Sequence, residues 1–443
     1  MVPETYNEET SENTYTGRPS GEMSLYTSSM NSSESNNYRL RMYVDEGYNP
    51  QGDGGGLQFT VQINVYGKAG DKYVSVGETI LTSNELQEEK ENMFNYTSNG
   101  TQYDPNDYDD YATDPDPEYI TNGLYSMEDE DGTSYYYRGN VDNNNVQFGT
   151  YDSDYYVYHS KGEYNSDLYF QSLESCQEYN SSCSESDRIK LASRGDKMYW
   201  KIVRVNGDGS LRLIYNGTSV NPDNSDLAHS YTVGSSPYNL NADNPKYTGY
   251  TYDRDTNETD SFIKKEVDTW YTNTLGSTAY DSKVSSGRFC SDSSGYQEGS
   301  TFGYDYIFAS VDRLSQLDNN FAKPNNPSLK CPSTSESYGG SYRLKAGLIT
   351  ADELVLAGVS MGVTGNSYLT SGDGLSYWGM TPFAFAYNRA DVSTLISYLG
   401  LVFNAVDSTD GSYGVRPVIN INANSKFASG DGTAENPYVI TAE

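Results

Sequence analysis

The sequence predicts an α+β fold in which strands dominate. Short runs of alternating apolar and polar residues recur along the chain, and clusters of Gly, Asn, Asp and Ser separate them, which is the pattern of β-strands joined by turns. Helical periodicity is confined to a few segments. Because 443 residues exceed the size at which one hydrophobic core keeps growing, we expect more than one domain.

The N-terminal part predicts a partial β-sandwich preceded by an arm. Residues 1–36 are polar and rich in Ser and Glu, so they would form no core alone. Within residues 37–94, strand alternation appears at 38–44, 57–67 and 72–82. Three strands leave an apolar face and two edges that need partners.

Two solutions for these uncovered edges stay open. Either the rest of the chain packs on them, or a strand from another copy completes the sheet by strand addition. Residues 21–29 of the arm can extend and are the candidate donor strand. The acidic, Pro-rich residues 95–119 predict a linker or an extended loop before the C-terminal module, residues 120–443.

A hairpin in the C-terminal module is the best-defined local element. In "MYWKIVRV", alternation places Trp200 and Ile202 on one face and Val203 and Val205 on the other, so both faces should be covered. The turn "NGDG", residues 206–209, predicts that the chain then returns as a second strand in "LRLIY".

Tyrosine-rich segments are the candidate ligand-contact surfaces. "TSYYYR" predicts a strand that runs into a polar Asn turn. Exposed tyrosines would supply rigid amphipathic contact area, whereas alternate tyrosines in a strand would face the core. The candidates are Tyr135, Tyr136, Tyr137, Tyr155, Tyr156 and Tyr158.

Few helices are expected. Residues 260–275 carry a helical apolar stripe with Asp260 as a possible cap, and residues 350–358 show capping-box spacing with Gly358 as the stop. Residues 389–406 begin amphipathically, but their later apolar run fits a strand equally well. The closing segments "GVRPVINI" and "NPYVIT" predict strands.

Composition narrows the location and the partners. The formal charge of −33 argues against binding to nucleic acid or anionic membranes. No apolar run of about 18 residues exists, and the N-terminus lacks the basic start and apolar core of a signal peptide, so we expect no membrane insertion and a signal that is absent or already removed.

The cysteines indicate an oxidising, extracellular setting, with reduced cytosolic thiols as the alternative. Local closure favours a disulfide between Cys176 and Cys183, which leaves Cys290 with Cys331, although the sequence alone allows other pairings.

Catalytic and metal signals are weak. His159 and His229 are the only histidines, which makes a zinc site improbable. Ser360 in "GVSMG" imitates a nucleophile elbow, but no histidine follows it in the chain to complete a catalytic triad. Calcium is possible as a cofactor, although a solvated acidic loop without EF-hand spacing explains the same residues, which are Asp104, Asn106, Asp107 and Asp109 in one loop and residues 142–145 in another.

A family resemblance rests on "EDGTSYYYRGN", "YWKIVRVNGDGSLRLIYNGT", "YGVRPVINI" and "GDGTAENPYVIT". In these motifs the chain resembles surface proteins of gut Firmicutes, a group with no assigned reaction. Their C-terminal modules look like the C-type-lectin or formylglycine-generating-enzyme superfold. Upstream, residues 38–67 resemble the last strands of β-sandwich domains in Gram-positive fibre proteins of the camelysin type. The resemblance implies that Arg416 lies in the core in a buried ion pair.

These observations lead to one expected function and two alternatives. We expect a non-enzymatic, extracellular subunit of a bacterial surface fibre or pilus-like filament, assembled from copies of itself by β-strand complementation. The first alternative is an adhesin whose tyrosines contact a host or cell-wall glycan or protein. The second is an enzyme of the formylglycine-generating type, which would need Cys290 or Cys331 as a reactive thiol rather than in a disulfide.

Overall fold

The structure is a computed structural model, and the chain divides into two compact units, Met1–Val74 and Ser75–Glu443. Nearly all the described residues belong to the second unit. The predicted arm, the strands at 38–44 and 57–67, and the linker at 95–119 lie outside the described residues and stay predictions. The structure describes residues 74–89, 93, 122–162, 165–251, 259–292, 295–298, 306–314, 326–331, 340–359, 367–370, 376–396, 401–411 and 413–442.

Strands outnumber helices among the described residues, which confirms the strand-dominated prediction. The α-helices are α2 (Val76–Ser83), α3 (Leu173–Tyr179), α4 (Phe262–Asn273), α5 (Ala309–Leu314) and α6 (Ala351–Leu356). The short 3₁₀ helices are η3 (Glu185–Asp187), η4 (Leu227–His229), η5 (Pro245–Thr248) and η6 (Ala279–Lys283). The strands are β1 (Gly123–Glu128), β2 (Thr133–Arg138), β3 (Asn145–Thr150), β4 (Tyr155–Lys161), β5 (Asp167–Phe170), β6 (Arg188–Ala192), β7 (Lys197–Val205), β8 (Leu211–Tyr215), β9 (Gly234–Ser235), β10 (Val284–Ser285), β11 (Gly287–Ser291), β12 (Gly295–Glu298), β13 (Tyr306–Phe308), β14 (Gly340–Leu344), β15 (Ala346–Gly347), β16 (Tyr377–Ala386), β17 (Arg389–Ile396), β18 (Leu401–Asp407), β19 (Gly414–Val415), β20 (Val418–Ile421) and β21 (Tyr438–Ile440).

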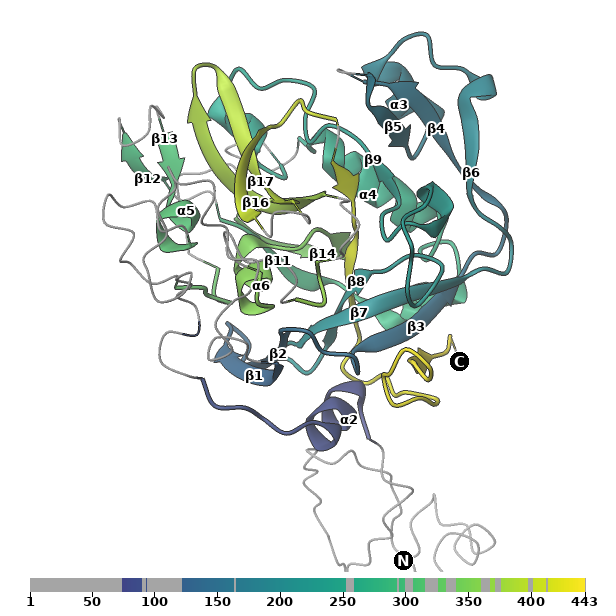
Figure 1. The fold of residues 1–443 in the computed structure, drawn as a ribbon, viewed down its shortest axis with the longest axis vertical. Helices are drawn as coiled ribbons and strands as arrows, with labels where there is room; N and C mark the ends of the chain where they lie inside the picture. The colour runs from purple at the N-terminus through teal and green to yellow at the C-terminus, as the bar shows by residue number, and fades with distance from the viewer. Residues whose placement is uncertain are drawn as a thin grey trace, which may run out of the picture. The chain divides into compact units, whose positions relative to one another are not determined.

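Two large sheets organise the second unit (Figure 1). In the first, the order is β1-β2-β7-β8-β20-β10; β3 also pairs with β7, β21 with β3, and β15 with β20. In the second, the order is β12-β13-β16-β19-β9-β5-β4-β6, and the hairpins β16–β17 and β17–β18 extend it. A separate pair, β11 and β14, carries Cys290.

The predicted hairpin is confirmed as β7 and β8, which pair antiparallel across the turn at residues 206–209. Asn206 N–H donates to the Ser210 carbonyl oxygen at 2.8 Å, and Gly209 adopts a φ of 82°, a left-handed conformation that glycine accepts without steric cost. Trp200, Ile202 and Val203 are all buried, so both faces of β7 are covered as expected.

The main core forms around aromatic residues from three elements. The rings of Trp200 on β7 and Tyr215 on β8 meet edge to face with centroids 5.3 Å apart, and Trp270 of α4 contacts both. Helix α4 confirms the helix predicted at 260–275. Its cap is Ser261 rather than Asp260, because the Ser261 side chain accepts the Lys264 N–H at 3.2 Å.

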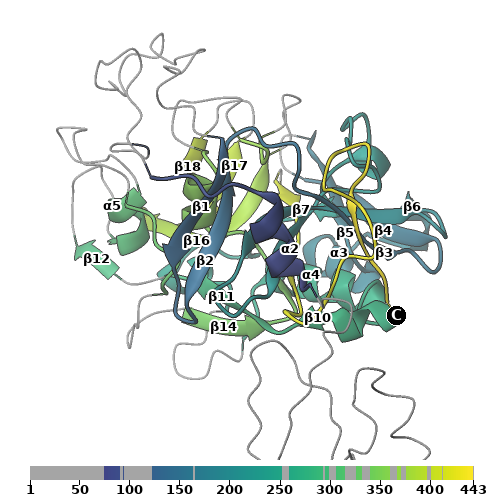
Figure 2. The same ribbon diagram turned by 90° about the horizontal axis from the view of Figure 1, so that it is seen from below.

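The strand predicted at 72–82 is wrong, because residues 76–83 form helix α2. The Ser75 side chain caps it by accepting the Glu78 N–H at 3.2 Å. Figure 2 shows α2 as the dark purple helix of the second unit. A Cβ on Gly77 would lie 3.0 Å from Val205, so this glycine lets the helix approach β7 closely.

The remaining C-terminal predictions concern one helix and several strands. Helix α6 confirms the predicted capping box, since Thr350 and Glu353 bond each other's backbone N–H groups. Residues 389–406, for which helix and strand were both open, contribute β17 and β18, which pair antiparallel. The closing segments form β19, β20 and β21 as expected, and β21 lies parallel to β3.

Arg416 is buried as the resemblance implied, but its partners differ from the expected ion pair. Its guanidinium donates to the Tyr215 carbonyl oxygen at 2.8 Å and to Asn216 Oδ1 at 3.1 Å. It also lies over the rings of Tyr231 and Tyr377, 4.6 and 5.0 Å from their centroids. Neutral oxygens and aromatic faces therefore hold this charge in the core.

Candidate functional site

The predicted tyrosine surfaces are largely internal. Tyr136, Tyr137 and Tyr155 are buried, so their prediction as ligand contacts is wrong. On β2 the two neighbouring tyrosines face opposite sides: Tyr137 joins the main core and Tyr136 stacks on Tyr125 in a second cluster. Because β2 is covered on both faces, neither tyrosine reaches the surface. Tyr135, Tyr156 and Tyr158 are partly exposed.

The other predicted site residues take mostly structural positions. Cys176 pairs with Cys183 and Cys290 with Cys331, the pairing that local closure favours. The calcium candidates Asp104, Asn106, Asp107 and Asp109 lie outside the described residues, as does Ser360. In the other candidate loop, residues 142–145, the Asn144 and Asn145 side chains bond protein groups. Among the described residues, no His, Cys, Asp and Glu side chains group as metal ligands.

A hollow beside the Cys290–Cys331 disulfide is the candidate site. A small cavity of about 30 Å³ lies there, and a more open hollow of about 470 Å³ adjoins it through shared wall residues. We call the two together the arginine hollow. The side chains that give the cavity its positive charge are Arg204, Arg212, Arg288, Arg313 and Lys330.

Two of these arginines face each other across the β7–β8 hairpin. Arg204 and Arg212 are directly paired in register, which would place two like charges side by side. Glu353 of α6 lies between them: its Oε1 is 3.1 Å from Arg204 Nε, and Arg212 Nη2 donates to its Oε2 at 3.1 Å. The buried carboxylate thereby neutralises the repulsion and ties α6 to the hairpin.

The β1–β2 turn closes the same network from the other side. Asp129 accepts the Ser134 hydroxyl at 2.6 Å and the Gly207 N–H at 2.9 Å, and its Oδ2 is 3.2 Å from Arg204 Nη1. These bonds hold the turn against the tip of the β7–β8 hairpin. The arginine hollow therefore has a rigid, hydrogen-bonded floor.

Electrostatics fixes the charge states of this floor. Burial raises the pKa of Glu353, but the charges of Arg212 and Arg204 outweigh burial and hold its pKa below the ordinary value. For Asp129, burial is likewise outweighed by the bonds from Ser134, Gly207 and Asp131, so its pKa is also lowered. Burial lowers the pKa of Arg212 to about 10, which leaves it charged at neutral pH.

The mouth of the hollow carries a second set of ion pairs. Arg313 of α5 bonds Asp352 of α6, and its Nη2 lies 3.1 Å from Asp292 Oδ2. Asp352 also accepts the Ser328 N–H at 2.7 Å, which anchors the segment that leads to Cys331. The disulfide and this ion-pair set together fix residues 328–331 at the rim.

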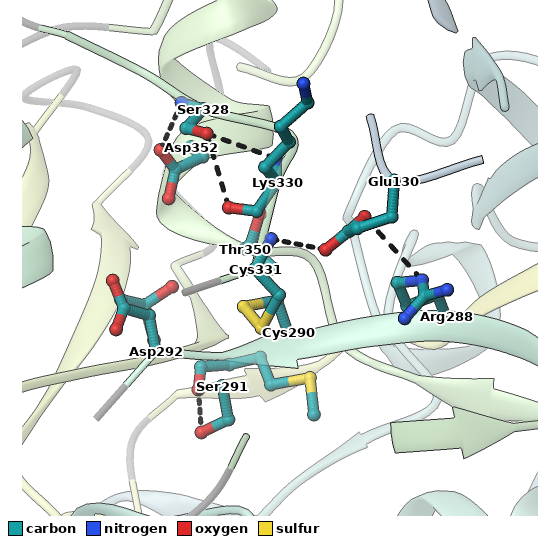
Figure 3. The surroundings of a disulfide bond; sticks show 12 residues. Glu130, Arg288, Cys290, Ser291, Asp292, Ser328, Lys330, Cys331, Thr350 and Asp352 are labelled. Carbon is teal, nitrogen blue, oxygen red and sulfur yellow. Dashed lines mark hydrogen bonds and ion pairs between the residues drawn. A yellow bond between two sulfur atoms is a disulfide. The ribbon is translucent and has the colours of Figure 1, made fainter. Parts of the chain in front are cut away.

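Figure 3 shows how the disulfide is placed within this arrangement. Glu130 accepts the Cys331 N–H at 2.5 Å, and its other carboxylate oxygen lies 3.6 Å from Arg288 Nε. The Lys330 side chain extends away from the disulfide. Both cysteines are partly exposed, and every cysteine of the chain is in a disulfide, so the structure has no free thiol of the kind that the formylglycine-generating alternative needs.

The lining of the cavity is more positive than the chain around it. Five cationic side chains line it against two carboxylates, Asp352 and Glu353, whereas the whole chain carries −33. Asp129, Glu130, Asp131 and Asp292 contact the arginines from outside this lining, so among the described residues six carboxylates in all surround the five cations. The wall of the cavity is therefore positive although the wider cluster is nearly balanced in charge, and a positive wall on a strongly acidic protein is suited to holding an acidic group.

Sequence reasoning missed this site, but one signal pointed toward it. Arg204 lies in a strand expected to be covered on both faces, and a buried arginine needs hydrogen-bond acceptors, of which a carboxylate is the strongest. The partner could not be named, because Asp129 and Glu353 are 75 and 149 residues away in sequence.

Comparison with protein-family models, curated protein sequences and solved structures finds no match to this chain. The C-type-lectin-like and camelysin-like resemblances therefore stay predictions. In the part of the chain that the structure describes, no helix has the length and apolar character needed to cross a bilayer.

Proposed function

We propose that this chain is an extracellular, non-enzymatic surface protein that binds an acidic ligand in the arginine hollow. The observation that carries the proposal is the concentration of cationic side chains in the lining of one cavity of a chain with a charge of −33. The two disulfides support the extracellular location, because such bonds persist in oxidising compartments.

The ligand class follows from the charges. An acidic glycan carries planar carboxylate groups or tetrahedral sulfate groups, and guanidinium and ammonium groups recognise the oxygen atoms of both. Arg204, Arg212 and Arg313 are held in place by internal carboxylates, which balance most of their charge. Lys330 is exposed and forms no ion pair with another described residue, so it is the cation best able to contact the ligand directly.

The test is a binding measurement with acidic and neutral glycans at two salt concentrations. We expect binding to uronic-acid or sulfated glycans that weakens with salt, because ions screen exposed charges over about 10 Å at 0.1 M. Lys330→Glu should weaken binding about tenfold or more, which corresponds to about 1.4 kcal/mol. Lys426→Glu is the matched control, since Lys426 is exposed and does not line the hollow.

Two outcomes would end the proposal. The first is an absence of binding to any acidic glycan at low salt by the folded protein. The second is an equal loss of affinity in both variants, because this would trace the effect to net charge rather than to the hollow.

Fibre assembly by strand complementation is a separate proposal from the sequence. It depends on residues 1–36 and on the partial β-sandwich at 37–94, most of which lies outside the described residues. Deletion of residues 1–36 should leave a folded monomer in size-exclusion light scattering and negative-stain microscopy. Polymers that survive this deletion would exclude the arm as the donor strand.

A further inference from the structure

A lysine and an asparagine face each other in close contact on neighbouring strands. Lys201 of β7 and Asn145 of β3 are directly opposite in the antiparallel register. Lys201 Nζ lies 2.5 Å from Asn145 Oδ1. Hydrogen bonds from nitrogen to oxygen usually span about 2.7–3.2 Å, so this is a close contact between the amine and the amide group.

The orientation of the Asn145 amide is fixed by its other bonds. Asn145 is buried, and its Nδ2 donates to the Asp142 carbonyl oxygen at 2.9 Å and to the Gly432 carbonyl oxygen at 2.8 Å. Both amide protons are therefore used, and the oxygen must be the atom that faces Lys201. The carbonyl carbon, Cγ, is one covalent bond from the oxygen that the lysine nitrogen contacts.

The surroundings of Lys201 disfavour a charged ammonium. On its other side the cross-strand neighbour is Ile214, which is fully buried. Within the described residues, Asn145 Oδ1 is the one hydrogen-bond acceptor for its three ammonium protons. Burial and the charge of Arg416 lower the pKa of Lys201 to about 8, against an opposing effect of Asp142. About a tenth of the amine is then neutral and nucleophilic at pH 7.

We propose that Lys201 and Asn145 form an intramolecular isopeptide bond. The neutral Nζ attacks Cγ of Asn145, a bond forms between Nζ and Cγ, and a proton passes from Nζ to Nδ2. The bond between Cγ and Nδ2 then breaks with release of ammonia. One amine and one primary amide become one secondary amide and ammonia, so the step needs no oxidant, reductant or cofactor.

The fold supplies what this step requires. The two strands hold the reacting groups together, which replaces a bimolecular encounter by a reaction within one folded chain. The charge of Asp142 acts on Lys201, and the backbone carbonyl oxygen of Asp142 holds the amide of Asn145 in place. The bond would also lock β3 to β7 where Gly432 of the C-terminal segment meets Asn145.

Intact-mass measurement of the full-length folded protein tests the proposal. We expect a mass below that of the sequence with two disulfides by the mass of one ammonia. After tryptic digestion, residues 139–161 and 198–204 should appear as one branched peptide, because trypsin does not cleave after an acylated lysine. Fragmentation of that peptide should place the link between Lys201 and Asn145.

Two variants separate this bond from other losses of ammonia, such as ring closure at Asn-Gly sequences. Lys201→Arg keeps the charge but removes the nucleophile, so the full mass should return. Lys197→Arg makes the same change at an exposed position of the same strand and should keep the lower mass. The peptide map of the unmodified sequence decides the question even where Lys201→Arg does not fold. A full mass with normal cleavage after Lys201 would overturn the proposal.

Discussion

A buried carboxylic acid on α4 makes the stability of the fold depend on pH in an unusual direction. Glu266 is 1 % exposed, and its Oε2 accepts the Gln171 N–H at 2.7 Å. Burial raises the pKa of Glu266 to about 7, although hydrogen bonds from Ser175 and Gln171 oppose it. The folded protein therefore retains this proton at a pH where the unfolded chain has released it.

The sign and the size of the effect follow from the two pKa values. The unfolded value is 4.5 and the folded value is about 7. Between these values the unfolded state binds fewer protons, so the free energy of unfolding falls as pH rises through this window. The interval corresponds to a loss of about 3 kcal/mol in the free energy of unfolding, which is complete above pH 7 and absent below pH 4.

Glu266→Gln isolates this contribution. Glutamine keeps an acceptor for the Gln171 N–H and cannot ionise, so the variant should gain about 3 kcal/mol relative to the unsubstituted protein between pH 4 and pH 8. The assay is urea unfolding at a series of pH values, followed by tryptophan fluorescence. Glu174→Gln, the same change at an exposed position of α3, is the control. A stability difference that stays constant within about 0.5 kcal/mol across the series would refute the assignment.

Two further predictions concern the disulfides and the arginine hollow. Replacing the Cys290–Cys331 pair by serines should lower the unfolding free energy by about 4 kcal/mol, and replacing Cys176–Cys183 by about 2 kcal/mol. The bridges span 41 and 7 residues, and a bridge across a longer loop removes more conformational entropy from the unfolded chain. Urea unfolding of the two variants should show this order, and the reverse order would contradict the loop-entropy argument. Glu353→Gln should cost about 3–5 kcal/mol at pH 7 by the same assay, since it leaves buried Arg212 without a carboxylate and Arg204 with Asp129 alone; a loss no larger than for an exposed glutamate would show that the network does not stabilise the fold.

Local signals predicted the parts of the fold that depend on neighbouring residues. The turn at residues 206–209 and the alternation on both sides fix a hairpin by themselves. Helix α2 was missed although Ser75 and Glu78 have capping-box spacing, because the short alternation around them also fits a strand. Helix α2 packs against Val205 of β7, which favours the helix, but Val205 is too far away in sequence for a local pattern to reveal this contact.

The candidate site could not be predicted because it is assembled from distant segments. Arg204, Arg313 and Glu353 come from a strand and two helices, and only the completed sheets bring them together. The tyrosines on β2 are the reverse case, because the sequence suggested a site where the structure places core residues. Their composition suggested a surface, but Tyr136 and Tyr137 pack on opposite covered faces.

The pairing of the C-terminal segment with the start of the second unit has a mechanical consequence. Val76 N–H donates to the Ser425 carbonyl oxygen at 2.8 Å, and β21 lies beside β3, so the chain enters and leaves this unit on one side (Figures 1 and 2). Tension between the two ends of this unit would load these peripheral contacts first and leave the aromatic core outside the path of the force.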